Sequence, residues 1–268
     1  CYLPGEITMG AGDVYLGEHV ELRRRVAIKL IKTQYASDEQ LAGRMRREAR
    51  IVSRLSHPAL VQIYDLGSTL DRRTFIAMEY LEGQVLRALL NQRISLQPGD
   101  AAQLIVMALD GLDVAHRASI VHRDVKPENL FLTQHGQLKI LDFGVAKPLS
   151  TTDLTGIMTA AGQVLGTPRY MAPEQATGGT LSPATDIYAV GCVLFELLTG
   201  TPLAIGTEPA QLLHHHLVVT APSLGSRTGR SFDPTLENII ARALNKNPRQ
   251  RFPSAEAMAQ ELRGFMAR

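Results

Sequence analysis

The stretch "IVHRDVKPENLFLTQHGQLKILDFGVAK", residues 120–147, decides the fold because apolar runs alternate in it with charged side chains. Two strand-like runs, "NLFLT" and "QLKIL", flank the turn "QHG", a pattern typical of a short hairpin. This hairpin would hold Asn129 at one end and Asp142 just past the other, so that their side-chain oxygens converge. Carboxylate and amide oxygens offered from loops are ligands that Mg²⁺ prefers, commonly together with phosphates. The stretch therefore predicts a magnesium site.

Two further charged side chains stand on the loop before this hairpin. Asp124 lies five residues before Asn129, and Lys126 lies two residues after Asp124. The Asp124 carboxylate can accept a proton from an attacking hydroxyl, while the Lys126 ammonium neutralises charge on a phosphate. The spacing therefore indicates phosphoryl transfer to a hydroxyl group.

The composition describes an ordinary globular protein. The 268 residues are 45% hydrophobic and 20% charged, with a formal net charge of +2, which suits one large or two small cores. The 28 basic and 26 acidic residues are interspersed along the chain. Because no basic patch stands out, we expect no nucleic-acid partner.

Cysteine usage and apolar runs bear on the compartment. Cys1 and Cys192 are too few for a disulfide framework, which predicts a reducing compartment such as the cytoplasm. The longest apolar run, "IYAVGCVLFELL" at 187–198, is too short to cross a bilayer and contains Glu196, so it predicts a buried helix and no membrane segment in this chain. The start at Cys1 without Met indicates a domain cut from something longer. The alternative location is thus the cytoplasmic domain of a longer, membrane-anchored protein.

The chain changes from strand-like to helical patterning near residue 80, which predicts two lobes. Residues 13–32 hold two strand-like runs around a charged turn, which predicts a hairpin. A long helix is predicted from Asp100 onward. Another is predicted over 182–200, with Ser182 as the N-cap and Gly200 just past the end.

Two charges on apolar faces predict an ion pair between the first strands and a helix. Residues 37–58 predict a helix whose apolar face carries Glu48, and Lys29 lies in the middle of the apolar strand "VAIKLI". Burying either charge alone costs several kcal/mol, on the order of 5. We therefore expect Lys29 and Glu48 to pair.

Four motifs resemble, in order and spacing, the signature set of protein kinases: "VAIK" at 26–29, "HRDVKPEN" at 122–129, "DFG" at 142–144 and "APE" at 172–174. The resemblance covers nearly the whole chain and implies an α+β, bilobal protein-kinase fold over residues 1–268. It implies a small, mainly antiparallel β N-lobe with one key helix (1–81), a hinge (79–84) and a larger, mainly α-helical C-lobe (85–268).

The resemblance also implies a role for each site residue. Asp124 would be the catalytic base, assisted by Lys126, and Asn129 and Asp142 would hold Mg²⁺. Lys29 would contact the α- and β-phosphates of ATP and pair with Glu48. Mn²⁺ is an alternative metal. The implied nucleotide contacts are Gly10, Gly12, Val14, Ala27, Lys29, Met78 as gatekeeper, the carbonyl of Glu79, the amide of Leu81, and Phe131.

Details of the motifs indicate which class of protein kinase the chain resembles. Lys126 in "HRDVKPEN" resembles the serine/threonine kinases, and "GTPRYMAPEQA" resembles their bacterial branch. The implied partners are protein substrates with Ser or Thr acceptors. By the same resemblance Asp186 ties a buried helix to the catalytic loop, and Arg251 pairs with Glu174.

The glycine-rich loop departs from the family pattern. Aligned on Val14, the pattern requires glycine at 7, 9 and 12, but the chain has Ile7, Met9 and Gly12. Glycines let the backbone approach phosphates closely, so Ile7 and Met9 predict a looser or differently shaped loop and call tight nucleotide binding into question. The alternative function is a pseudokinase or nucleotide-binding scaffold that signals through its surfaces. A small-molecule kinase of similar fold is a third reading.

The segment between "DFG" and "APE" predicts regulation. Arg123 precedes the catalytic base in a loop expected to be buried, so its guanidinium needs an anion. Phosphorylated Thr159, or secondly Thr155, would supply one, with the phosphate added by a second copy in a transient homodimer.

Residues 214–216 are three histidines. They predict a solvated helix end and no metal site, because consecutive residues on a helix point in different directions and cannot share one metal ion.

Overall fold

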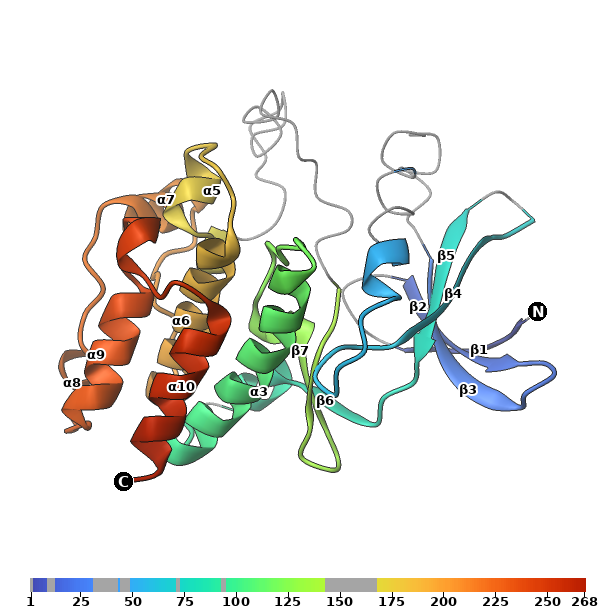
Figure 1. Cartoon of the computed structure of the whole chain (residues 1–268), viewed down its shortest axis with the longest axis horizontal. Coiled ribbons are helices and arrows are strands. Elements are labelled where there is room, and N and C mark those ends of the chain that lie inside the picture. Colours follow the sequence, from blue (N-terminus) through green and yellow to red (C-terminus); the bar gives the residue numbers. More distant parts are fainter. Residues whose placement is uncertain are drawn as a thin grey trace.

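A five-stranded antiparallel sheet forms one end of the molecule and helices form the other (Figure 1). The computed structural model describes residues 2–8, 13–30, 43, 49–70, 73–92, 95–142 and 168–268. The strand order of the sheet is β1-β2-β3-β5-β4. Its strands are β1 (Tyr2–Thr8), β2 (Asp13–His19), β3 (Arg24–Leu30), β4 (Ile63–Ser68) and β5 (Thr74–Glu79).

The hairpin predicted for residues 13–32 is confirmed as β2 and β3. Val14 stands opposite Lys29 in the register, and Leu16 stands opposite Ala27. On the other side of β3, Lys29 stands opposite Ile76 of β5. Lys29 is therefore flanked on both sides by strands, which fixes where its side chain leaves the sheet.

A second sheet of three strands lies between the first sheet and the helices (Figure 1). The predicted hairpin is confirmed in it, with Leu130 opposite Ile140. At the start of β6, Gly83 has a φ of 149°, and a Cβ there would lie 2.1 Å from the carbonyl oxygen of Leu132, so only glycine fits. The strands are β6 (Gly83–Val85), β7 (Leu130–Thr133) and β8 (Leu138–Ile140).

The helical end is built around α6 (Pro183–Thr199), which packs against α3, α9 and α10 (Figure 1). It is confirmed as the predicted buried helix, because 14 of its 17 residues are buried and Ser182 and Gly200 flank it. The other helices are α2 (Leu86–Asn91), α3 (Pro98–Arg117), α5 (Pro173–Ala176), α7 (Pro209–Leu217), α8 (Leu224–Thr228), α9 (Pro234–Ala243) and α10 (Ala255–Met266). Three short 3₁₀ turns are η2 (Pro127–Asn129), η3 (Pro168–Tyr170) and η4 (Pro248–Gln250).

Two predicted helices differ from expectation or are described only in part. Helix α3 begins at Pro98 rather than Asp100, because proline suits the first helical turn, where its missing N–H would have no partner. Asp100 lies in that first turn. Of the helix predicted over 37–58, residues 43 and 49–52 are helical in the structure, and Glu48 lies outside the described residues.

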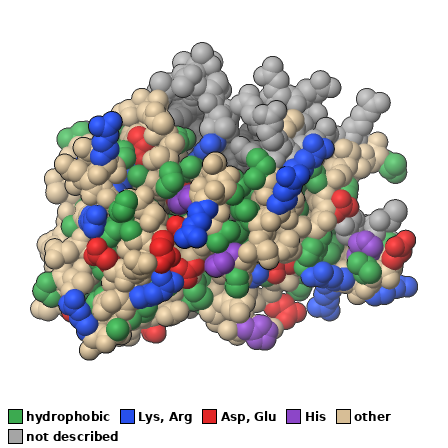
Figure 2. All heavy atoms as spheres, viewed as in Figure 1, with side chains coloured by type: hydrophobic (Ala, Val, Ile, Leu, Met, Phe, Trp, Pro, Cys, Tyr) green, Lys and Arg blue, Asp and Glu red, His purple; other side chains and the backbone are tan. Residues whose placement is uncertain are grey.

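Charges of both signs are mixed over the face drawn in Figure 2, on the sheet and on the helices. Basic and acidic residues, which are interspersed along the sequence, are thus also mixed on that face of the structure. Ion pairs also join neighbouring elements, as between Arg263 of α10 and Asp110 of α3, whose Nη2 and Oδ1 lie 2.6 Å apart.

The histidines at the end of α7 correct one prediction. His214 is exposed, but His216 is fully buried, so the helix end is not wholly solvated. His216 Nε2 lies 2.9 Å from the carbonyl oxygen of Arg169, and its Nδ1 lies 2.9 Å from the hydroxyl of Tyr188. Because a carbonyl can only accept, Nε2 carries the proton and the neutral ring accepts at Nδ1. His216 thereby ties α7 to η3.

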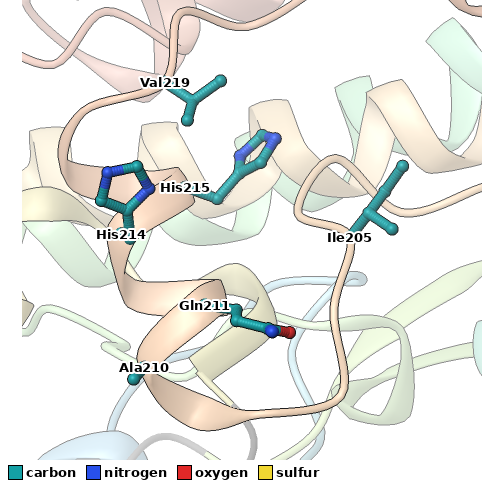
Figure 3. A pocket seen from close by; sticks show the side chains of 6 residues that line it. All are labelled: Ile205, Ala210, Gln211, His214, His215 and Val219. Atoms are coloured by element: carbon teal, nitrogen blue, oxygen red, sulfur yellow. The ribbon is translucent and has the colours of Figure 1, made fainter.

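A hollow of about 490 Å³ lies between α7 and the segment that precedes it (Figure 3). Ile205, which is 64% exposed, faces the helix across it. None of the predicted catalytic or nucleotide-binding residues lines the hollow, so it is a surface feature apart from the predicted site. Its lining residues are Ile205, Ala210, Gln211, His214, His215 and Val219.

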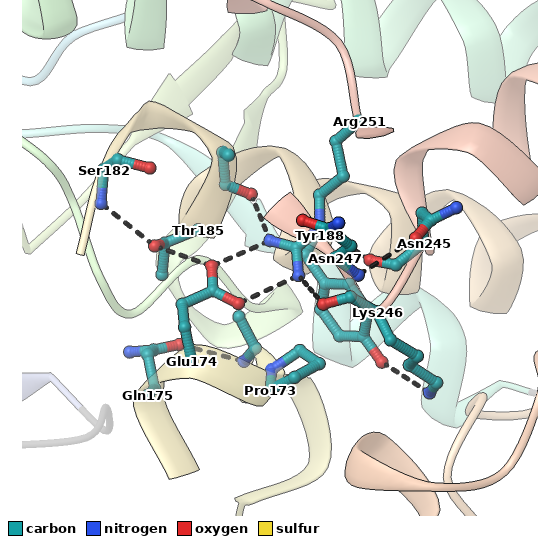
Figure 4. Close-up of polar contacts among 12 residues, drawn as sticks. Pro173, Glu174, Gln175, Ser182, Thr185, Tyr188, Asn245, Lys246, Asn247 and Arg251 are labelled. Atoms are coloured by element: carbon teal, nitrogen blue, oxygen red, sulfur yellow. Dashed lines mark hydrogen bonds and ion pairs between the residues drawn. The ribbon is translucent and has the colours of Figure 1, made fainter. Parts of the chain in front are cut away.

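The predicted pair of Glu174 and Arg251 is confirmed in the core of the helical end (Figure 4). Nη1 and Nη2 of Arg251 donate to the two carboxylate oxygens of Glu174 at 2.7 and 2.9 Å, and the Arg251 side chain is 0% exposed. The guanidinium also lies over the ring of Tyr188, 4.7 Å from its centroid. Its remaining N–H groups donate to the carbonyl oxygens of Ala184, Asn245 and Lys246. A fully paired guanidinium thus fixes α5 against α6 and η4.

Removing the cation of this pair should destabilise the protein strongly. In Arg251→Met the Glu174 carboxylate stays buried without its ion-pair partner, so the free energy of unfolding should fall by about 3–5 kcal/mol. Arg263→Met is the matched control, because it removes an arginine whose side chain is 42% exposed and should cost about 0–1 kcal/mol. Urea denaturation measures both. Equal losses would contradict the assignment of the buried pair.

His216 should make stability depend on pH. Burial lowers its pKa from 6.5 to about 4, with Lys246 and Arg169 adding repulsion of the charged form. Between pH 6.5 and pH 4 the histidine is therefore protonated in the unfolded chain but stays neutral in the folded protein. The free energy of unfolding should fall as the pH drops from about 6.5 to about 4, by at most about 3 kcal/mol. Urea denaturation at pH 7 and pH 5 should show a smaller loss in His216→Gln than in His214→Gln, the exposed control. An equal loss of unfolding free energy in both variants would show that His216 is not the source of the pH dependence.

Candidate active site

The carboxylate of Asp186, at the start of α6, accepts backbone hydrogen bonds from the loop before β7. The backbone N–H groups of His122 and Arg123 donate to Oδ2 and Oδ1 of Asp186, each at 2.8 Å. His116 Nε2 also lies 2.7 Å from Oδ2, and Asp186 is only 1% exposed. Its place in the first helical turn suits an anion, since the helix N-terminus carries positive potential. The structural role predicted for Asp186 is confirmed.

This anchored loop brings three predicted site residues together. Lys126 Nζ lies 2.9 Å from Oδ2 of Asp124, and the side-chain nitrogen of Asn129 donates to the same oxygen at 3.1 Å. Asn129 Nδ2 also donates to the backbone carbonyl of Asp124 at 2.8 Å. The turn η2 returns the chain so that these contacts form. Because the amide nitrogen is directed at Asp124, the amide oxygen is the atom that Asn129 can offer to a metal.

A second ion pair joins the large sheet to the segment after β8. Lys29 Nζ lies 2.6 Å from Oδ1 of Asp142, and the two side chains are 24% and 35% exposed. Thus the structure brings together two residues that are 113 positions apart in the sequence. The predicted partner of Lys29, Glu48, lies outside the described residues, so that pair stays a prediction.

Two non-glycine residues of this region have left-handed backbone. The φ angle is 66° at Arg123 and 41° at Asp142. Such conformations are unfavourable for residues with a Cβ and are concentrated at functional sites, where surrounding contacts hold them. Here Asp186 holds the amide of Arg123, and Gln175 donates to its carbonyl at 2.9 Å.

The residues predicted to contact the nucleotide base lie on adjacent strands of the large sheet. Ala27 of β3 stands opposite Met78 of β5, and Val14 of β2 stands opposite Lys29. Glu79 ends β5, and Leu81 follows on the way to β6. Phe131 stands on β7, opposite Val85. Gly10 and Gly12 lie outside the described residues.

One contact in this region was not predicted from the sequence. Lys139 Nζ of β8 lies 2.6 Å from Oε1 of Glu79, and these side chains are 12% and 19% exposed. The same carboxylate oxygen accepts from the amide of Gln62 at 2.8 Å. The pair joins the end of β5 to the strand that leads to Asp142. The sequence did contain a signal for this ion pair, because Lys139 and Glu79 each stand in an apolar strand, as Lys29 does.

The structure shows two groups of predicted site residues, Asp124 with Lys126 and Asn129 on the anchored loop and Lys29 with Asp142 just after β8. Their carboxylates, amide and lysines are donors suited to Mg²⁺ and phosphate. The sequence model of the family described as the protein kinase domain matches residues 8–262. The chain therefore belongs to the protein kinase family, and the resemblance seen in its motifs is confirmed.

Similar proteins agree in class and in fold. Serine/threonine-protein kinase PrkC of Bacillus subtilis is 40% identical over 254 residues, which are 95% of this chain and 38% of that protein. Serine/threonine-protein kinase PknB of Mycolicibacterium smegmatis is 37% identical over 256 residues, 94% of this chain and 40% of that protein. The chain thus spans about two fifths of the length of these relatives. A crystal structure of a point mutant of the Mycobacterium tuberculosis PknI kinase domain superposes with a TM-score of 0.78 at 25% identity, covering 100% of this chain and 96% of that one.

The predicted bilobal fold class is confirmed by this superposition and by the small antiparallel sheet and helical end. The lobe limits of 1–81, 79–84 and 85–268 stay a prediction. In the part of the chain that the structure describes, no helix has both the length and the apolar character needed to span a membrane.

Proposed function

We propose that this chain is a serine/threonine protein kinase that transfers the γ-phosphoryl group of Mg-ATP to Ser and Thr hydroxyls of proteins. The observation that carries the proposal is the cluster on the anchored loop, where Lys126 and Asn129 both contact Oδ2 of Asp124 within 3.1 Å. The ion pair of Lys29 with Asp142 adds the predicted phosphate-binding and metal-binding groups. The serine/threonine-protein kinase names of the relatives support the same acceptor class.

Each residue of the cluster has a part in the transfer. The Asp124 carboxylate orients the acceptor hydroxyl and takes its proton, while Lys126 stabilises charge on the transferred group. The oxygens of Asn129 and Asp142 would hold Mg²⁺, which supplies neutralisation of the phosphate charge. Lys29 would contact the α- and β-phosphates and pair with Glu48. Carboxylate and amide oxygens fit this metal, and Mn²⁺ would fit the same donors.

The adenine would bind at the end of β5. The backbone carbonyl of Glu79 and amide of Leu81 would pair with the base, beside Met78. The ion pair of Glu79 with Lys139 fixes the end of β5 and so holds these backbone groups in position. The base and phosphates would further contact Val14, Ala27, Phe131, Gly10 and Gly12.

Cys192 has a structural place in the core. Cys192 is fully buried in α6 as a free thiol, and burial raises its pKa, which makes it unreactive. From the low cysteine count of the sequence we infer a reducing compartment, either the cytoplasm or the cytoplasmic side of a membrane-anchored protein. The complete catalytic set favours the enzyme over a signalling scaffold, since a scaffold would not require Asp124, Asn129 and Asp142 together.

Two substitutions separate the predicted roles. Asp124→Asn and Asp142→Asn should each lower the rate of phosphoryl transfer by about 10²-fold or more, because one removes the base and the other a metal ligand. Only Asp142→Asn should weaken magnesium-dependent ATP binding. Intact-mass measurement after incubation with Mg-ATP gives the first quantity, and calorimetric titration with and without Mg²⁺ gives the second. Equal losses of ATP binding would refute this division.

Arg123 is the basis of a proposed phosphorylation switch. Its Nε is buried and has no hydrogen-bond partner among the residues that the structure describes. A phosphate on Thr159, or secondly on Thr155, would offer the oxygens that a guanidinium binds, and so order the segment for peptide docking. Both threonines lie outside the described residues. We infer that a second copy adds the phosphate in a transient homodimer.

The switch predicts a matched set of activities. Thr159→Ala, alone or with Thr155→Ala, should slow phosphorylation of an added protein substrate about tenfold or more, because the ordering anion is lost. Phosphatase treatment should slow the wild type equally, but should leave Arg123→Ala unchanged. Initial rates with radiolabelled ATP measure these effects. If dephosphorylated wild type is as active as the phosphorylated form, there is no such switch.

A further inference from the structure

Arg87, in the first turn of α2, joins four elements next to the catalytic loop. Its Nε donates to Oε1 of Glu128 in η2 at 2.7 Å, and its Nη1 donates to Oε1 of Glu196 in α6 at 2.9 Å. Its Nη2 contacts the hydroxyl of Tyr170 in η3, which donates to Oε2 of Glu196. One guanidinium thus occupies a site made by two carboxylates and a phenol.

The deep part of this site requires a cation. The Glu196 side chain is 4% exposed, and a carboxylate buried that deeply is costly unless it is paired. Burial by itself lowers the pKa of Arg87, but its hydrogen bonds with Glu196 and Glu128 outweigh burial and raise the pKa overall. Burial, and then Glu196, raise the pKa of Tyr170. The site therefore holds a permanent cation and a neutral phenol.

The outer part of the site lies on the same loop as the proposed catalytic base and is partly exposed. Glu128 is 34% exposed and lies four residues after the proposed base Asp124 on the same loop. Its Oε2 atom is buried and has no hydrogen-bond partner within the described ranges. Arg87 is 23% exposed, so the ion pair of Arg87 and Glu128 reaches the surface. A side chain of a docked peptide could approach the site from that surface.

We propose that Arg87 determines substrate specificity: its guanidinium fills an acidic site that would otherwise bind a basic side chain of the protein substrate. The inference rests on the proposed kinase function and deepens it. With Arg87 present, one positive charge meets the two carboxylates and leaves a net charge of −1. Without it the site carries −2. A basic substrate side chain therefore gains little in the wild type, because Arg87 already takes the charge-assisted hydrogen bonds.

The test uses a peptide panel that carries a single serine or threonine acceptor. Each neighbouring position is replaced in turn by arginine, alanine or glutamate, and kcat/KM is measured. The wild type should prefer arginine over alanine by less than about twofold at every position, whereas Arg87→Gln should prefer arginine about tenfold at one position. Adding Glu128→Gln to this variant should abolish the preference. The control Arg263→Gln removes a distant ion pair and should behave as the wild type.

Two further variants separate specificity from folding. Arg87→Lys keeps a cation in the site, so it should phosphorylate arginine and alanine peptides about equally well, as the wild type does. If Arg87→Gln does not fold, Arg87→Gln with Glu196→Gln removes the lone buried carboxylate and should still gain the arginine preference through Glu128. Guanidinium ion at low, non-denaturing concentration should compete with the substrate arginine in Arg87→Ala and reduce its preference. A purely structural arginine would not give these responses.

The outcomes are distinguishable. A folded Arg87→Gln that phosphorylates the panel with the preferences of the wild type would overturn the inference and leave the proposed function intact. An arginine preference that survives Glu128→Gln would also overturn it. A wild type that phosphorylates no peptide or protein in a manner abolished by Asp124→Asn would overturn the proposed function, and the inference with it.

Discussion

The carboxylate of Asp186 is the contact on which the candidate active site depends. It accepts the backbone N–H groups of His122 and Arg123, and thereby fixes a loop in which Arg123 has left-handed backbone. Without that acceptor, two backbone amides of the loop would lose their partner and the strained turn would relax. The position of Asp124, one residue further on, follows from this anchor.

Helix α6 supplies such anchors to three sites although it is apolar nearly all round. Asp186 at its start holds the catalytic loop, and Tyr188, one turn in, lies between His216 and the guanidinium of Arg251. Glu196, near its end, holds Arg87 and the hydroxyl of Tyr170. Because all three side chains leave one rigid, buried helix, their distances from one another are set by the helix itself.

Ion pairs join the parts of the site that lie far apart in the sequence. Lys29 reaches Asp142 from the large sheet, and Lys139 reaches Glu79 from the small one. Pairs of this kind add little net stability, because the cost of removing charges from water offsets their attraction. Their effect is on geometry, since an uncompensated charge in either position would be costly. We infer that they fix how the two sheets meet.

The sequence by itself determined the local elements and the catalytic loop. The hairpin around residue 136, the caps of α6 and the spacing of Asp124 and Asn129 depend on a few neighbouring residues, so periodicity and motifs predict them. The tertiary structure alone decided that His216 is buried, that Lys139 pairs with Glu79, and that Arg87 lies between its two carboxylates. Those partners are up to 109 residues apart. Their meeting depends on how whole elements pack, which no local pattern encodes.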